Sequence, residues 1–177
     1  MKDSRIGLKT YWNMLIQKGW RLPIKFFCES HWYDIRRCTD THNWRPKELE
    51  VDNNHYPQKS DGIMYMASWT GDLKYWIEYL QTYLGEEFKK FQFIDVGCGK
   101  GKPCLVYSEL LLNKKEVYNP IGIDYSEKNI KIAVRNSSTI SQRIKNFKQP
   151  RFILGEASNL PNYIRTDSLI LYLYNPF

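Results

Sequence analysis

Short apolar runs alternate with amphipathic segments through the second half of the chain. Four runs have the length and composition of β-strands, and each is followed by Gly, Asp or Asn. They cover residues 92–96, 118–123, 151–154 and 168–174. The last run, Ser-Leu-Ile-Leu-Tyr-Leu-Tyr, is almost continuously apolar, which is typical of a strand buried on both faces at the centre of a parallel sheet.

The segments between these runs have helical patterns. Residues 103–112 are expected to form one helix, with Pro103 in the first turn, where its missing N–H is not needed. A second helix is expected from the N-cap Ser126 to about Asn136. Strands that are joined through helices imply a parallel sheet with right-handed crossovers. The pattern therefore predicts an α/β fold with a Rossmann-like parallel sheet.

The first ninety residues are aromatic-rich and less regular. Residues 72–84 are expected to be helical, because Leu73, Ile77, Leu80 and Leu84 form one stripe that should lie against the sheet, and Gly85 follows. Residues 8–16 are expected to form a short helix, and Pro23 limits how far it can extend. Residues 28–59 are expected to form a loop. We divide the chain into an N-terminal helical and loop extension, 1–90, and a half domain, 91–177.

Composition narrows the class of protein. The chain has 177 residues, 42% apolar residues and a net charge of +7. It contains no run near the roughly 20 apolar residues of a membrane span and no apolar leader core, so we expect a soluble, cytoplasmic protein without a membrane partner. The four cysteines form no C-x-x-C pair, and no metal site is predicted. The basic charge leaves a nucleic-acid partner open, although no run of Lys and Arg exceeds two residues.

The candidate chemistry begins directly after the first strand, at Asp95-Val-Gly97-Cys-Gly99-Lys-Gly101. Glycines let a backbone turn sharply and approach a ligand closely. A dinucleotide fingerprint would place its third glycine at position 102, which is Lys102. A carboxylate at Asp95 would repel a pyrophosphate but suits the ammonium and sulfonium groups of S-adenosylmethionine (SAM). The alternative is a tight turn without a ligand. Lys100 and Lys102 are interpreted as solvated, with pairing to the methionine carboxylate as the alternative.

Polar residues follow the other three strands. Asp124 is placed to accept hydrogen bonds from ribose hydroxyls, the alternative being a helix cap. Glu156-Ala157 is a candidate for the adenine side, the alternative being a surface turn. Asn175, Pro176 and Phe177 follow the fourth strand, where the amide could orient a nucleophile and the ring could stack on a flat substrate. Trp44 and Tyr56 are candidates for a lid or substrate surface, or for packing under a loop.

Taken together, these residues resemble the class I SAM-dependent methyltransferases. The resemblance implies SAM as the cofactor. It makes Asp95, Gly97, Gly99 and Gly101 the first motif, Asp124 the acid that binds the ribose, and Glu156-Ala157 the position beside the adenine. It makes Asn175-Pro176-Phe177 the catalytic corner. More narrowly, the Gly-Lys-Gly loop and the Asn-Pro-Phe motif resemble a group of largely uncharacterised bacterial methyltransferases, with Asp40-Thr41 and Tyr56-Pro57 as further matches.

The family's sheet has seven strands, whereas this sequence stops after the fourth. Three interpretations stay open. The chain is a fragment of a longer product, or the exposed fourth strand pairs with a second copy or another chain, or the first ninety residues cover that strand. The expected function is methyl transfer to an unidentified acceptor, which is a protein, a nucleic acid or a small molecule. The alternatives are a truncated, non-catalytic SAM-binding or partner-binding remnant, and a nicotinamide-binding domain.

Overall fold

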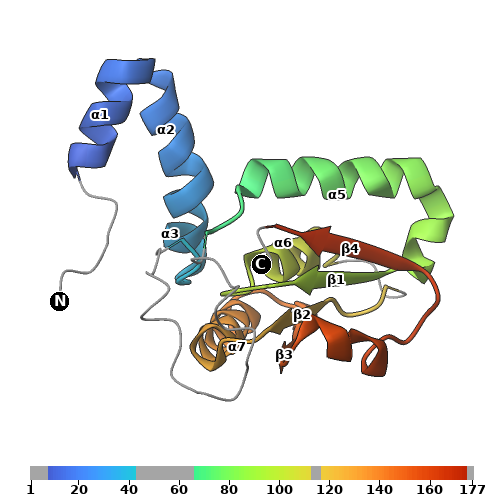
Figure 1. Cartoon of the computed structure of the whole chain (residues 1–177). Coiled ribbons are helices and arrows are strands. Elements are labelled where there is room, and N and C mark those ends of the chain that lie inside the picture. Colours follow the sequence, from blue (N-terminus) through green and yellow to red (C-terminus); the bar gives the residue numbers. More distant parts are fainter. Residues whose placement is uncertain (1–7, 43–65, 113–116, 175–177) are drawn as a thin grey trace.

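The computed structural model describes residues 8–42, 66–112 and 117–174. Four strands form one parallel sheet in the order β3-β2-β1-β4 (Figure 1). The strands are β1 (Gln92–Val96), β2 (Ile121–Asp124), β3 (Arg151–Leu154) and β4 (Leu169–Leu173). All four strands and their parallel pairing were predicted, and the largest difference is at β2, which begins three residues later than expected.

Three long helices accompany the sheet: α5 (Thr70–Leu84), α6 (Lys102–Leu110) and α7 (Glu127–Ser141). The predicted stripe of α5 is confirmed. Leu73 and Ile77 are 3% exposed and share an apolar cluster with Leu105 of α6 and with Phe93 and Tyr172 of the sheet. Gly85 ends α5 with a positive φ of 53°, which few side chains tolerate. Ser126 caps α7, because its hydroxyl accepts from the N–H of Asn129.

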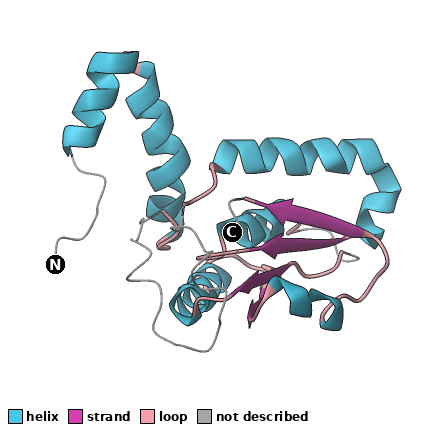
Figure 2. Cartoon of the chain, in the orientation of Figure 1, coloured by secondary structure: helices cyan, strands magenta, loops and turns pink. Residues whose placement is uncertain are grey.

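The other face of the sheet carries a smaller apolar cluster. Ile94, Ile121 and Ile123 form its centre, and Leu160 of the short helical segment η4 (Ala157–Asn162) packs against them. Figure 2 shows η4 as the helical turns between β3 and β4. Side chains therefore cover both faces of the central strands β1 and β2.

β4 differs from its prediction. The apolar run predicted a central strand buried on both faces, but β4 lies at the edge of the sheet and pairs only with β1 among the described strands. Its side chains alternate between the two faces of the sheet. Leu171 and Leu173 lie on the same face as Ile94, and they are 51% and 58% exposed.

The N-terminal residues form more helix than predicted. α1 (Leu8–Lys18) ends at Gly19, where φ is 74°, and α2 (Arg21–Phe27) starts with Pro23 in its first turn. The helix then continues through a π-helical turn, η1 (Cys28–Trp32), into α3 (Tyr33–Arg37), so the loop prediction is wrong for residues 28–37. A six-residue 3-10 segment, η3 (Gly85–Lys90), connects α5 to β1.

Candidate functional site

A sharp bend follows β1 and leads directly into α6. Gly97, Gly99 and Gly101 have φ values of 75°, 50° and 85°, a backbone region that side chains with a Cβ rarely adopt. The N–H groups of Gly97 and Cys98 both donate to the carbonyl of Ile123, at 2.9 and 3.0 Å. The predicted glycine motif is therefore a bend that is fixed against the end of β2.

Asp95 lies at the mouth of this bend and is 2% exposed. Its Oδ2 is buried and has no hydrogen-bond partner among the described residues. Burial raises the pKa of Asp95 well above its usual range, and the nearby charge of Asp124 raises it further. An unpaired carboxyl group in this position favours a ligand that brings a positive charge or a hydrogen-bond donor.

A small cavity of about 10 Å³, room for about one water molecule, borders Asp95 and Gly97. Ser68, Pro103 and Tyr172 also line it. The cavity is too small for a nucleoside, so only one end of a ligand would reach Asp95 there.

Asp124 joins the glycine bend to the start of α7. Its Oδ2 accepts from the N–H of Gly99, and its Oδ1 accepts from the N–H of Ser126, both at 2.7 Å. Burial raises the pKa of Asp124 to about 6, although these hydrogen bonds act in the opposite direction. A side-chain hydrogen bond from Asn129 also lowers the pKa of Asp124, so three donors already meet this carboxylate. A carboxylate has about four acceptor positions, which leaves room for one further donor.

The remaining candidates lie beyond β3 and β4. Glu156 is partly buried and precedes η4, where its carboxylate accepts from Ser158 at 3.3 Å, and Ala157 is exposed. Gly155, just before them, donates its N–H to the Asp124 carbonyl. The structure thus brings Asp95, Asp124 and the three glycines together, with Glu156 at the same end of the sheet. Asn175, Pro176, Phe177, Trp44 and Tyr56 lie outside the described residues.

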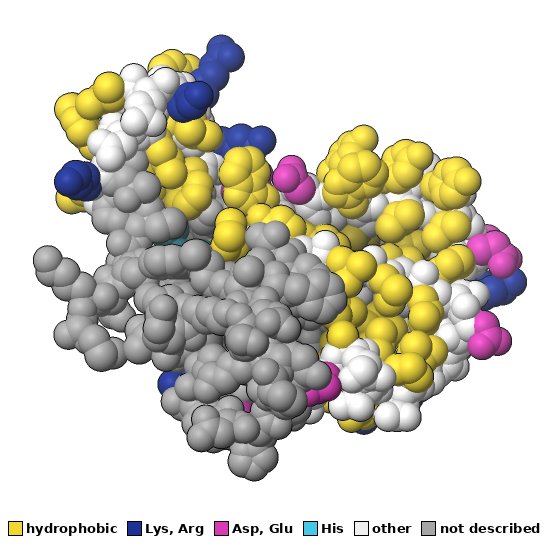
Figure 3. Space-filling model, in the orientation of Figure 1, with side chains coloured by type: hydrophobic (Ala, Val, Ile, Leu, Met, Phe, Trp, Pro, Cys, Tyr) yellow, Lys and Arg dark blue, Asp and Glu magenta, His cyan; other side chains and the backbone are white. Residues whose placement is uncertain are grey.

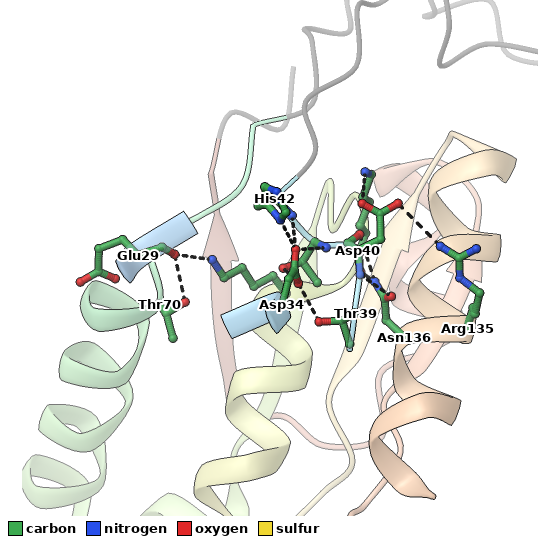
Figure 4. A network of polar contacts seen from close by, with 11 residues as sticks. Glu29, Asp34, Thr39, Asp40, His42, Thr70, Arg135 and Asn136 are labelled. Atoms are coloured by element: carbon green, nitrogen blue, oxygen red, sulfur yellow. Dashed lines mark hydrogen bonds and ion pairs between the residues drawn. The ribbon is translucent and has the colours of Figure 1, made fainter. Parts of the chain in front are cut away.

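The two lysines of the bend are not solvated, so that interpretation is wrong. Lys100 is 0% exposed, and its ammonium lies 3.1 Å from Asp40 (Figure 4). The side chain of Asn136 on α7 accepts from the N–H of Asp40 and donates to the carbonyl of Lys100. These contacts connect the N-terminal segment, the glycine bend and α7.

Lys102 turns toward the N-terminal helices. It is also 0% exposed, and its ammonium donates to the carbonyl of Glu29 at 2.8 Å. Burial lowers its pKa to about 8, while the charges of Asp34 and Glu29 act in the opposite direction. Thr70 at the start of α5 donates to the same Glu29 carbonyl, so this segment also connects to α5.

Asp34 is the acceptor at the centre of a second group of contacts (Figure 4). It accepts from the hydroxyls of Thr39 and Thr41 at 2.6 and 2.7 Å, and from the Nδ1 of His42. The N–H groups of Thr41 and His42 donate to it as well. Burial alone would raise its pKa, but these hydrogen bonds lower the pKa to about 2, so Asp34 is a carboxylate at neutral pH.

Sequence reasoning missed Asp34, His42 and the inward direction of both lysines. The pair Asp40-Thr41 was noted only through the family resemblance, and the partner of Asp40 lies 60 residues further along the chain. Nothing in local spacing signals such a contact, because it depends on how α3 packs against α6. Arg37 and Tyr33 determine that packing through their contacts with Glu109, at 2.5 and 2.8 Å.

The residues at the bend fit a SAM-type cofactor. The unpaired Oδ2 of Asp95 suits a positively charged group, and the glycines leave room for close backbone approach. Among the described residues, no group of three His, Cys, Asp or Glu side chains could hold a metal ion.

One family model matches the part of the chain that contains the glycine bend. Residues 87–171, just under half of the chain, match the family model described as a methyltransferase domain. The matched range contains β1, the glycine bend, Asp124 and β3. No curated protein matches the chain.

The similar solved structures include magnesium protoporphyrin IX methyltransferase from Synechocystis PCC 6803. Its structure with bound SAM has 15% sequence identity and a TM-score of 0.42, over 85% of this chain and 60% of that one. Its structure with bound SAH has 15% identity and a TM-score of 0.41, over 85% and 57%. The chain thus spans about 60% of the length of the protein it matches.

Within the described ranges, no helix is both long enough and apolar enough to cross a bilayer.

Proposed function

We propose that this protein is a SAM-dependent methyltransferase that acts in the cytoplasm. The observation that carries the proposal is the buried Oδ2 of Asp95, which has no hydrogen-bond partner within the described ranges, beside a bend with three positive-φ glycines. The match of residues 87–171 to a methyltransferase domain supports the same conclusion. The acceptor would be a protein, a nucleic acid or a small molecule.

The chain's own residues would mainly bind and orient, because SAM supplies an already activated methyl group. Gly97, Gly99 and Gly101 would let the backbone approach the methionine part of the cofactor. Asp95 would balance its positive charge, and Asp124 would accept from the ribose hydroxyls. Holding two reactants in line contributes about 7–11 kcal/mol to such a reaction.

Two further roles complete the proposal. Glu156 and Ala157 would contact the adenine side of the cofactor, beyond β3. Asn175, Pro176 and Phe177 would form the acceptor corner after β4. There Asn175 would orient the nucleophile and Phe177 would stack on a flat acceptor. These roles come from the sequence pattern at the strand ends.

The test is calorimetric titration of the purified chain with SAM, SAH and NAD, for the wild type and for Asp95→Asn. We expect the wild type to bind SAM and SAH but not NAD, and Asp95→Asn to bind SAM at least about tenfold more weakly. Asp167→Asn, which changes an exposed acid, is the matched control and should bind normally. Because the Oδ2 of Asp95 has no hydrogen-bond partner in the described part of the chain, the replacement should not lower the thermal stability of the ligand-free protein.

A radiolabelled methyl-release assay separates the enzyme from its main alternative. SAM binding without release to protein, nucleic acid or small-molecule fractions would favour a non-catalytic SAM-binding or partner-binding remnant. Stabilisation by NAD instead of SAM would favour the nicotinamide-binding alternative. Absence of binding to any of the three ligands would contradict the proposal.

A further inference from the structure

The N-terminal helices α1 and α2 expose large apolar side chains in a regular pattern. Leu8, Trp12 and Ile16 repeat every four residues along α1, and Trp20, the N-cap of α2, and Ile24 of α2 follow at the same spacing in the sequence. Their exposed fractions are 90%, 62%, 66%, 63% and 54% in that order. We call these five residues the hairpin face. In Figure 3 hydrophobic side chains lie over this end of the molecule.

The aromatic contacts between the two helices use different residues. Tyr11 of α1 packs edge-on against Phe26 of α2 with ring centroids 5.9 Å apart, and both rings contact His31. These ring contacts join α1 to α2 and include no residue of the hairpin face. Single exposed apolar residues are common on proteins, but a contiguous set marks a surface for interaction.

The same surface is hollowed between the helices. Leu8, Trp12 and Leu15 form one wall of an open groove of about 550 Å³. Trp20, Pro23 and Ile24 form the other wall. Apolar groups of a partner could enter this groove and remove the tryptophan rings from water.

The charge around the groove has one sign. Residues 8–28 contain Lys9, Lys18, Arg21 and Lys25 and no acidic residue. On α1 the two lysines lie on either side of the apolar stripe, as expected from 100° per residue. A second copy of the same face would bring like charges together, so charge complementarity favours an anionic partner.

We propose that the hairpin face binds the surface of a lipid bilayer that contains anionic phospholipids. Tryptophans and aliphatic side chains flanked by Lys and Arg are typical of helices that lie in a membrane interface. At 11 and 7 residues, α1 and α2 are too short to span a bilayer, so the contact is with one leaflet. The proposal departs from the sequence-based expectation of no membrane partner, which depended on the lack of a membrane-spanning run, and it is independent of the proposed methyl transfer.

Vesicle flotation of the full chain tests the proposal. The wild type is mixed with vesicles of phosphatidylcholine alone or with 30 mole per cent phosphatidylglycerol. We expect flotation with the anionic vesicles only, and release as the salt concentration rises. The double variants Trp12→Ser/Trp20→Ser and Lys18→Gln/Arg21→Gln should each bind at least about tenfold more weakly.

The controls change other exposed residues, away from the hairpin face. Val134→Ser/Leu154→Ser removes two exposed aliphatic side chains from α7 and β3, and Lys145→Gln/Arg143→Gln removes two exposed charges. Both controls should float like the wild type, and circular dichroism should show that all variants are folded.

Three results would overturn the proposal. The first is no flotation with anionic vesicles. The second is an equal loss of binding in the hairpin variants and the controls. The third is that the wild type does not bind vesicles but instead dimerises in sedimentation velocity or binds an RNA oligonucleotide, and that Trp12→Ser/Trp20→Ser abolishes this interaction.

Discussion

Gly101 occupies a position of the glycine bend that leaves no room for a side chain. Its φ is 85°, and a Cβ at this position would lie 2.5 Å from Cζ of Phe152 and 3.0 Å from Cβ of Ala133. We predict that Gly101→Ala lowers the free energy of unfolding by about 2–4 kcal/mol, because the cost of a strained backbone and the cost of overpacking add together. Urea denaturation measures the change.

Gly155→Ala is the matched control for this prediction. Its added Cβ would have its nearest neighbour at 3.6 Å, an ordinary contact, and its φ is outside the left-handed region. We expect a change within about 1 kcal/mol. Equal destabilisation by the two substitutions would show that the bend is not constrained as described.

Asp124 predicts a pH dependence of SAM binding. Its pKa is raised from 3.8 to about 6 by burial, and a ribose hydroxyl that donates to the carboxylate would lower it again. Binding should therefore release protons near pH 5.5, and affinity should increase as the pH rises from 5 to 7. Calorimetry at pH 5.5 in two buffers of different ionisation enthalpy measures this release. Proton uptake on binding would contradict the prediction.

At the scale of single residues, the sequence predicted the bend but not its surroundings. Three glycines after a strand indicated a bend, because few other residues adopt positive φ. Asp95 was predicted to face a charged ligand, and this role stays a prediction. The buried state of Lys100 and Lys102 was not predictable, since lysines in a loop are usually solvated.

At the scale of elements, Asp34 holds the end of α3 and the segment that follows it. Its carboxylate accepts hydrogen bonds from Thr39, Thr41 and His42. We predict that Asp34→Asn lowers the free energy of unfolding at pH 7 by about 3 kcal/mol, because an amide replaces an ionised acceptor among buried donors.

The pH dependence of this effect has a definite sign. The pKa of Asp34 is lowered from 3.8 to about 2, so its contribution is fully present above about pH 4 and is lost as the pH falls toward 2. Wild-type stability should therefore fall more steeply below pH 4 than that of Asp34→Asn. Glu86→Gln, which changes an exposed acid, should retain the wild-type slope. Parallel slopes for wild type and Asp34→Asn in urea titrations would contradict this assignment.

Elements with strong periodicity were predicted well, and elements held by distant contacts were not. The stripe of α5 and the capping serine of α7 are local signals, and both helices appeared within a few residues of their expected starts. η1 and α3 carry no such stripe. Their helical state depends on Glu109 and Lys102, which lie far along the sequence.

At the scale of the whole molecule, β4 leaves an apolar edge on the sheet. Leu171 and Leu173 are more than half exposed on one face, and an unprotected edge strand favours pairing with another chain. We predict that Leu173→Lys reduces concentration-dependent self-association in sedimentation velocity with a stability change below about 1 kcal/mol. The same substitution at Leu154, on the opposite edge strand β3, is the control and should leave self-association unchanged. Undiminished association of Leu173→Lys would show that β4 is not the contact.

The ion pair between Asp40 and Lys100 has a consequence for how the protein is made. The two residues are 60 positions apart, and Asn136, which holds Asp40 in place, lies 96 positions after it. On the ribosome, the segment around Asp40 therefore emerges long before its partners exist. Until α7 has been synthesised, the ammonium of Lys100 has no such carboxylate in a fixed position, and burying it alone would be unfavourable. The glycine bend should thus be among the last parts of the nascent chain to reach its final shape.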